Sequence, residues 1–315
     1  MTLAPAKILK RNMLVIACTH IHVRNIYFSE IGCRCDKSAA VMSQSGKIGR
    51  RGFVKYAAAA AVAATAGAYY TRGFWEPYLE NMKNPVKLAP ITELEELSLV
   101  PDIQLKDTDA LIIVDIQNDF MPSGALGVKE GDQIVIPINS LAEKFHRRNR
   151  VVVMTQDWHP PGHLSFASSH NMKPFDSYES EGIGPVLWPD HCVQGSPGAE
   201  FHPDLDLKSA IATIRKGYHP RVDSYSTFIE NDKKTYTGLS GYLDKLSIER
   251  IFLCGLALDY CVYYSAIDGR DLGFDVVIPI DLTKAINSPA GHLSNALSTM
   301  VHRGVQFTKP EYVVS

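Results

Sequence analysis

Short apolar runs rich in branched residues alternate along the chain with segments in which apolar residues recur every three or four positions. Such runs are typical of buried strands, and the longer spacing is typical of helices with one buried face. The runs lie at 110–114, 151–154, 210–214, 251–255, 276–278 and 305–307, and the helical segments lie at 134–148, 239–246, 260–272 and 289–300. Strands that alternate with helices form parallel sheets. We therefore predict an α/β fold over residues 108–315, with a doubly wound, mostly parallel sheet and helices on both faces.

The region before this domain has a different pattern. Residues 47–68 contain the pair Arg50-Arg51, then an alanine-rich apolar stretch and a small-residue end, in that order. This order resembles a twin-arginine export signal. A surface helix and a membrane span remain alternatives, although the stretch is weakly hydrophobic and shorter than the roughly 20 apolar residues that a bilayer requires.

An export signal belongs at the start of a protein, yet residues 1–41 precede Met42 here. We therefore expect translation to begin at Met42, residues 1–41 to be absent from the native product, and residues 42–68 to form the signal. The expected location is exported or periplasmic, through export machinery that reads the arginine pair. Membrane anchoring and a cytoplasmic location remain alternatives. Residues 69–107 contain scattered prolines and no sustained apolar period, which predicts an extended linker.

Composition excludes some classes of partner. The formal net charge is -2, from 32 basic and 34 acidic residues, so no basic surface for nucleic acid is indicated. The six cysteines show neither zinc-ribbon spacing nor a dense disulfide framework. A reactive thiol and a small-molecule substrate become the candidates to examine, while assembly into a homo-oligomer stays open.

Chemistry-bearing residues follow several of the predicted strands. Ligands of open parallel sheets bind beyond the carboxyl ends of the strands. Asp115 follows the first run, Lys216 follows the third, and Cys261 lies where a helix opens after the fourth. A carboxylate there can accept a proton, and an ammonium group and a helix start both favour a thiolate. Each residue alone also has an ordinary interpretation, as a loop former, a surface lysine or a buried thiol.

A second set of residues has the donor chemistry of a metal site. Asp157 and His159 alternate on a proline-containing loop after the second strand, so an extended backbone points both to one side. His191 lies in the long irregular segment that follows. Two imidazoles and one carboxylate leave coordination positions open for water and substrate, as in catalytic sites. Zinc, iron and manganese all accept this donor set.

From about Asp109 onward, these blocks resemble the nicotinamidases within the isochorismatase-like cysteine hydrolases. The resemblance implies the isochorismatase-like hydrolase fold. It assigns the catalytic triad to Asp115, Lys216 and Cys261 and the metal ligands to Asp157, His159 and His191. His163 matches a position that is a ligand in some members only.

The resemblance also implies contacts with a substrate ring. Phe120 and Trp188 match aromatic residues that hold a pyridine ring, and Tyr225 and Phe228 are expected near the pocket rim. A cis peptide before Ala257 is implied, with the amides of Ala257 and Cys261 aimed at the oxyanion.

The implied reaction is hydrolysis of nicotinamide to nicotinate and ammonia through a thioester on Cys261, assisted by one divalent transition metal, with zinc favoured over iron and manganese. A related hydrolase of another small amide or carbamoyl compound is the nearest alternative. A binding module that keeps the fold without catalysis is the alternative from another class.

Overall fold

The computed structural model describes residues 91–314. The predicted start at Met42, the signal segment at 42–68 and the first part of the linker, at 69–90, lie outside these residues. Within residues 91–314, every helix is too short or too polar to cross a membrane.

A seven-stranded sheet forms the centre of the described part, with strand order β4-β3-β2-β5-β6-β8 and β7 beside β5. The strands are β2 (Asp109–Val114), β3 (Val151–Asp157), β4 (Ala212–Lys216), β5 (Arg250–Leu256), β6 (Asp275–Pro279), β7 (Thr283–Lys284) and β8 (Gln306–Thr308). All pairs are parallel, which confirms the predicted sheet. The chain runs outward from β2 to β4 and then returns to β5, on the other side of β2. The strand order therefore reverses between β2 and β5.

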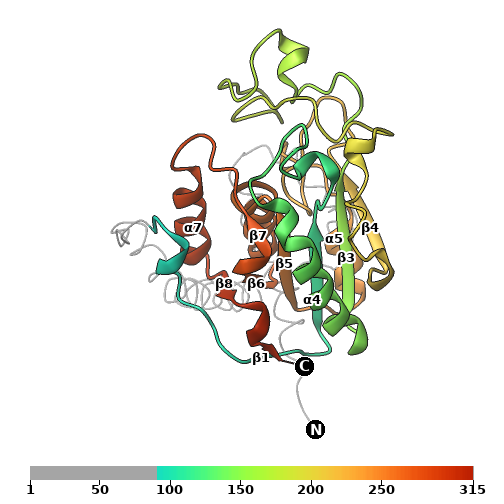
Figure 1. Ribbon diagram of the computed structural model, residues 1–315, viewed down its shortest axis with the longest axis vertical. Coiled ribbons are helices and arrows are strands. Elements are labelled where there is room, and N and C mark those ends of the chain that lie inside the picture. The colour runs from blue at the N-terminus through green and yellow to red at the C-terminus, as the bar shows by residue number, and fades with distance from the viewer. Residues whose placement is uncertain (1–90, 315) are drawn as a thin grey trace, which may run out of the picture. The chain divides into compact units, whose positions relative to one another are not determined.

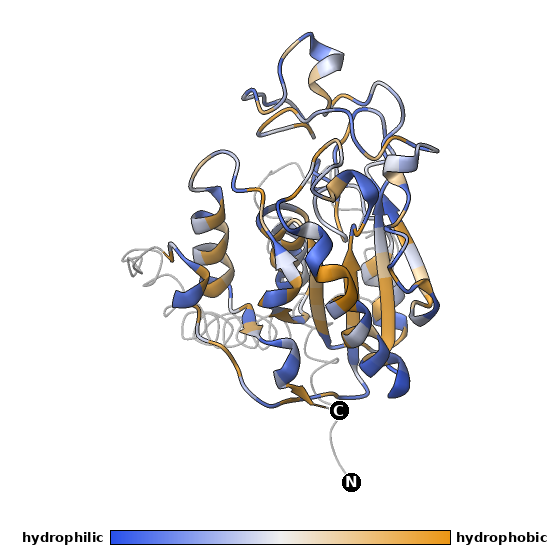
Figure 2. Cartoon of the chain, in the orientation of Figure 1, coloured by the Kyte–Doolittle hydropathy of each residue, from blue (hydrophilic) through white to orange (hydrophobic). Residues whose placement is uncertain are grey.

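Helices cover both faces of this sheet, as predicted. They are α4 (Val135–Arg147), α5 (Leu239–Lys245), α6 (Tyr263–Asp271) and α7 (His292–His302). Successive strand side chains point to opposite faces. Leu111 of β2 packs in one core with Phe145 of α4, whereas its neighbour Ile112 packs in a second core with Leu243 of α5 and Leu297 of α7. Figure 1 shows α4 in front of the sheet, and Figure 2 shows the apolar strands between the helix layers.

Several elements differ in extent from the sequence-based expectation. β3 continues beyond residue 154 to Asp157, and β4 includes Lys216, because these residues pair with each other in register. The helix expected at 260–272 begins as a π-helical turn, η7 (Leu258–Val262), which leads into α6. Short 3-10 turns complete the elements: η1 (Leu94–Glu96), η2 (Asn118–Phe120), η3 (Gly131–Ile134), η4 (Ala167–His170), η5 (Pro197–Ala199), η6 (Leu207–Ser209), η8 (Ile280–Leu282) and η9 (Pro310–Tyr312).

The described part of the expected linker, residues 91–107, packs against the C-terminal elements. Strand β1 (Ile103–Gln104) pairs in parallel with β9 (Val313–Val314). The amide of Val100 donates to the carbonyl of Phe307 at 2.7 Å, and Leu97 is buried. Ordered packing therefore begins before the domain start expected at residue 108. The apolar alternation of this segment covers only a few positions and is interrupted by Pro101, so it is too short to predict a strand.

Candidate active site

The predicted site residues meet at the carboxyl ends of the central strands. Asp115 directly follows β2, and its φ of 51° turns the chain sharply there. Asp157 and Lys216 end the neighbouring strands β3 and β4, and Cys261 lies in η7, just after β5. The point between β2 and β5, where strand order reverses, is the expected ligand site of a doubly wound sheet. The topology therefore brings four distant sequence segments together.

Lys216 connects the acidic residues to the thiol. Its side chain is fully buried, and its Nζ lies 2.9 Å from Asp115 Oδ2, 3.0 Å from Asp157 Oδ1 and 3.5 Å from Cys261 Sγ. The ammonium also donates to the carbonyl of Ser224 at 2.8 Å. A buried charge requires such partners, because an unpaired one would lose its hydration without compensation. Lys216 thus contacts both of the other residues of the predicted triad.

Burial and the Lys216 charge act in opposite directions on the pKa values of Asp115 and Cys261. Burial raises the pKa of Asp115, while the Lys216 ammonium acts in the opposite direction. Burial also raises the pKa of Cys261 well above its ordinary value, again against the effect of Lys216. A raised carboxyl pKa makes Asp115 a better proton acceptor than an exposed aspartate. Asp115 is therefore the group suited to accept the proton of the Cys261 thiol.

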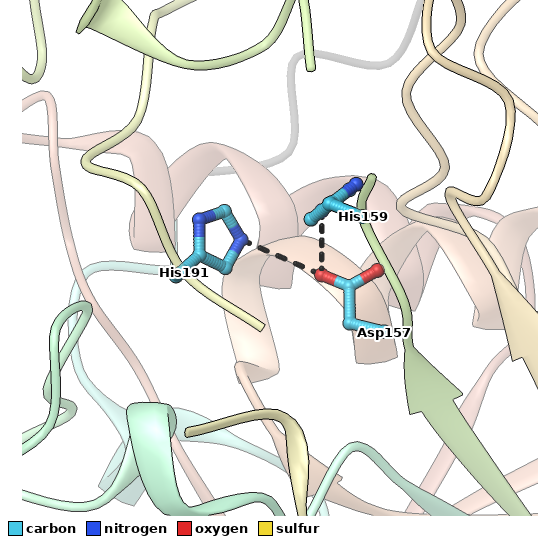
Figure 3. Close-up of side chains that lie close together, drawn as sticks. All are labelled: Asp157, His159 and His191. Atoms are coloured by element: carbon cyan, nitrogen blue, oxygen red, sulfur yellow. Dashed lines mark hydrogen bonds and ion pairs between the residues drawn. The ribbon is translucent and has the colours of Figure 1, made fainter. Parts of the chain in front are cut away.

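The two predicted histidine ligands face one oxygen of the third predicted ligand, Asp157. His159 Nε2 is 3.1 Å and His191 Nε2 is 3.5 Å from the same oxygen, Asp157 Oδ2 (Figure 3). All three side chains are buried, and one donor atom of each lies within 4.8 Å of the others. Burial raises the pKa of Asp157, but His159 and Lys216 outweigh burial and hold it well below its ordinary value. The donors form a compact anionic set that fits a divalent cation.

Hydrogen bonds from outside the set orient these ligands. His159 Nδ1 lies 2.9 Å from the carbonyl of Gly217, and His191 Nδ1 lies 2.8 Å from that of Pro189. A carbonyl accepts only from a protonated nitrogen, so each Nδ1 donates to its carbonyl and Nε2 is the atom that faces Asp157 Oδ2 and could bind an ion. Gln117 Oε1 accepts from the Asp157 amide at 2.7 Å and its Nε2 donates to the Asp157 carbonyl at 2.8 Å. These contacts prepare the donors before any ion arrives.

His163 has partners of its own. Its Nδ1 lies 2.7 Å from the Ser165 hydroxyl, and its Nε2 lies 2.8 Å from the carbonyl of His219. One of its nitrogens also lies within 4.8 Å of donor atoms of His159 and Asp223, so these three residues form a second candidate metal group. Because both of its nitrogens hydrogen-bond within the protein, His163 is the weaker candidate ligand in this conformation.

A small pocket with largely apolar walls adjoins the Cys261 thiol and the candidate metal ligands Asp157 and His191. Its lining residues are Phe120, Leu126, Asp157, Trp188, His191, Asp223, Tyr225, Ala257, Tyr260, Cys261 and Ile286. The Trp188 Nε1 donates to the Tyr225 hydroxyl at 3.0 Å, which in turn donates to the carbonyl of Gly184 at 2.9 Å. These two hydrogen bonds hold the side chains of Trp188 and Tyr225, two aromatic walls of the pocket, in place. Phe120, Trp188, Tyr225 and Ala257, which are the predicted substrate contacts, all line this pocket.

The peptide bond between Leu256 and Ala257 is cis, as predicted. Phe228, expected near the rim, instead lies fully buried in the core and stacks on Phe274 with ring centroids 5.7 Å apart. Tyr225 and Phe228 lie in an irregular segment, where no regular period shows which aromatic side chain turns toward the pocket and which toward the core. Leu126 and Ile286 also line the pocket but lie in no motif that would have identified them, and Tyr260 lines it directly before the predicted nucleophile.

Comparisons with known proteins agree with this geometry. The isochorismatase domain model matches residues 109–311. A nicotinamidase of Acinetobacter baylyi is 47% identical over 198 residues, which cover 62% of this chain and 90% of that protein. A structure from L. infantum, solved in complex with nicotinate, is 37% identical with a TM-score of 0.58 and covers 67% of this chain and 98% of that one.

The pyrazinamidase of Pyrococcus horikoshii, solved in complex with zinc, is 36% identical with a TM-score of 0.53 and covers 64% of this chain and 99% of that one. The matched region is the same α/β domain that carries the thiol, the ammonium and the metal-type ligands. Sequence family, fold and site geometry thus agree, and the chain belongs to the isochorismatase family, in the group that contains the nicotinamidases.

Proposed function

We propose that this protein hydrolyses the amide of nicotinamide to nicotinate and ammonia. The observation that carries the proposal is the sharing of one pocket by Cys261, the metal-type donors Asp157 and His191, and the aromatic wall of Trp188. A flat aromatic amide suits such walls, and the thiol adjoins the place where its carbonyl carbon would lie. The relatives named nicotinamidase support the same substrate.

The first half of the reaction forms a thioester. Asp115 accepts the proton of the Cys261 thiol, and the sulfur adds to the amide carbon. The backbone N–H groups of Ala257 and Cys261 hold the oxyanion, and Asp115 returns the proton to the departing nitrogen as the C–N bond breaks. Lys216, in contact with both partners, stabilises the charged forms through which the proton passes. Ammonia leaves.

The second half hydrolyses the thioester. Asp115 accepts a proton from water, the water oxygen adds to the acyl carbon, and the C–S bond breaks. The proton then returns to the Cys261 sulfur, which restores the thiol and releases the acid. A divalent cation held by Asp157, His159 and His191 would act as a Lewis acid and could bind the ring nitrogen of the substrate.

Zinc is our proposed metal. The two imidazole nitrogens and one carboxylate oxygen present here are ligands that zinc accepts in catalytic sites. The zinc complex of the Pyrococcus horikoshii relative supports this choice over iron and manganese. Metal analysis of the purified protein tests it, and stoichiometric iron or manganese without zinc would contradict it.

Ammonia release from nicotinamide tests the function itself. The metal-loaded protein should release ammonia and nicotinate in equal amounts, and Cys261→Ala should abolish release. Cys254→Ala is the matched control, because Cys254 is a buried thiol inside β5 that lies outside the pocket lining. It should keep most of the rate. A wild-type protein that is inert toward nicotinamide but cleaves an aliphatic amide or a carbamoyl compound would overturn the proposal.

We also propose export through the twin-arginine pair Arg50-Arg51. The order of charged, apolar and small residues after the pair supports it. Fractionation of cells that make the full chain should find the wild-type protein outside the cytoplasm and an Arg50-Arg51→Lys-Lys variant inside it. Equal distribution of the two proteins would contradict export by this route.

A further inference from the structure

The residue two positions before the nucleophile holds a loop of the pocket wall. Asp259 is fully buried, and its Oδ1 and Oδ2 accept from the amides of Ile286 and Asn287 at 2.9 and 2.7 Å. No other hydrogen bond to this carboxylate occurs within residues 91–314. A buried carboxylate whose two oxygens accept from two successive amides of one loop fixes the position of that loop.

Sheet pairing explains why this loop lies beside the nucleophile. Gly255 and Leu256, at the end of β5, pair in parallel with Thr283 and Lys284 of β7. The chain therefore leaves both strands at the same edge, and the turn after β5 adjoins the loop at 285–288 after β7. Of the residues that line the pocket, Ile286 is the one contributed by the chain beyond Cys261.

A second contact joins the same two segments. The Tyr260 hydroxyl donates to the carbonyl of Ser288 at 2.5 Å, and its ring stacks on His292 with centroids 4.4 Å apart. The side chains of Asp259 and Tyr260 thus fasten the loop on both sides of Asn287, whose φ of 50° turns the chain between them. The tripeptide that ends in the nucleophile also anchors a wall of the substrate pocket.

We propose that Asp259 is a positioning residue for substrate binding: it holds Ile286 against the substrate ring, in fixed relation to the Cys261 thiol. The inference deepens the proposed function and depends on it. Asp259 lies outside the pocket lining and acts through the loop. Displacement of Ile286 widens the pocket, so the ring binds less tightly and its amide is less often aligned with the thiol.

The first test is Asp259→Asn, which keeps the shape but turns one acceptor into an NH2 group that faces an amide. Loss of one charge-assisted hydrogen bond should raise KM for nicotinamide about tenfold, with a smaller fall in kcat. The Kd of nicotinate, measured by calorimetry, should rise by a similar factor. Bound metal should remain stoichiometric, since no ligand has changed. An unchanged KM and Kd would overturn the proposal.

Asp206→Asn is the matched control. Asp206 Oδ1 also accepts from a backbone amide, that of Lys208 at 3.0 Å, but in η6, which contributes no residue to the pocket. The same chemical change there should leave KM and Kd at their wild-type values. A shift in Asp206→Asn equal to that in Asp259→Asn would assign the effect to general destabilisation and reject a specific role.

A double-mutant cycle tests whether Asp259 acts through Ile286. In an Ile286→Ala background, Asp259→Asn should raise KM much less than it does in the wild type, because the wall that it positions has already been cut back. Additive effects would overturn the proposed route. If Asp259→Asn does not fold, Tyr260→Phe keeps the ring, removes the hydroxyl bond to Ser288 and should raise KM in the same direction.

These outcomes separate the two proposals. A wild-type protein that neither binds nicotinate nor cleaves nicotinamide contradicts the proposed function. A wild-type protein that does both, with Asp259→Asn, Tyr260→Phe and Ile286→Ala all at wild-type KM and Kd, contradicts only the positioning role.

Discussion

At the scale of single residues, the site depends on buried polar groups that satisfy one another. The Lys216 ammonium lies between the carboxylates of Asp115 and Asp157 and beside the Cys261 thiol. The position of the His159 ring depends on the backbone of Gly217, which accepts from it and leaves it room. The chemistry of the site is therefore sensitive to changes that remove a charge or add a single methyl group.

Removal of the ammonium should be costly for both stability and activity. Lys216→Gln leaves two carboxylates buried without their shared cation, and breaking a buried ion pair costs about 3–5 kcal/mol of unfolding free energy. The rate of ammonia release should fall on the order of a hundredfold or more. Urea denaturation and the ammonia assay measure the two effects. Lys234→Gln, which breaks the exposed pair with Glu181, is the control and should change neither.

A methyl group at residue 217 should weaken metal binding. The Cβ of Gly217→Ala would lie 2.6 Å from His159 Cε1, so the ring must move. Displacing a contact that orients a ligand lowers metal affinity about 10- to 100-fold, which competition with a chromogenic chelator can measure.

Gly195→Ala separates this clash from backbone strain. Gly217 and Gly195 have similar φ values, 64° and 75°, but a Cβ at Gly195 meets no atom within 4 Å. Both variants carry the strain of a left-handed alanine, roughly 1 kcal/mol. Only Gly217→Ala should lose metal affinity, and equal affinities in the two variants would contradict the orienting role of this glycine.

At the scale of elements, the segment between β4 and α5 carries a buried acid. Ile229 and Tyr236 form an antiparallel bridge, and the amide of Glu230 donates to the carbonyl of Thr235 at 2.8 Å. The Glu230 side chain is 1% exposed, and neither carboxyl oxygen has a hydrogen-bond partner within residues 91–314. Burial raises the pKa of Glu230 to about 7. The fold therefore prefers this side chain protonated.

This preference predicts a pH-dependent stability. Between pH 4.5 and about 7 the unfolded chain loses the Glu230 proton while the folded chain keeps it, so stability falls as the pH rises and then levels off. Glu230→Gln cannot ionise and should gain about 1–3 kcal/mol relative to wild type between pH 5 and pH 8. Chemical denaturation at the two pH values measures the gain. The exposed Glu179→Gln should gain nothing, and a pH-independent difference for Glu230→Gln would refute the expectation.

At the scale of the whole described domain, the metal-type ligands join parts of the chain that the sheet alone does not connect. Asp157 ends β3, whereas His159 and His191 lie in the irregular segment that Figure 1 shows beyond the carboxyl ends of the strands. An ion held by all three would tie that segment to the sheet. Its binding free energy would then add to the stability of the folded state.

Metal removal should therefore lower the Tm as well as the activity. An ion at a thousand times its Kd stabilises the folded state by about 4 kcal/mol, which a chelator removes. Differential scanning calorimetry with and without chelator measures the shift, and added Zn²⁺ should restore it. His191→Ala is the control, since a variant with an incomplete site should respond much less to chelator. Equal Tm values for the wild type with and without chelator would contradict a structural contribution of the ion.

The sequence could predict those elements of the fold that leave a local pattern of apolar residues. Apolar runs with period and length typical of buried strands indicated the main strands and the helices between them, and the parallel sheet followed from their alternation. β1, β7 and β9 were not predicted, because two-residue strands such as Thr283–Lys284 exist only through their pairing with a distant partner. The same is true of the last residues of β3 and β4.

By itself, the sequence determined which residues could do the chemistry: Asp115, Lys216 and Cys261 near predicted strand ends, and Asp157, His159 and His191 in a metal-type pattern. Only the tertiary structure decided that one ammonium contacts two carboxylates and the thiol, that Ile286 closes the pocket while Phe228 does not, and that Asp259 holds a loop. Residue type and local spacing are properties of neighbouring positions. Pocket walls and buried hydrogen bonds depend on contacts between segments far apart in the chain, which strand order and register bring together.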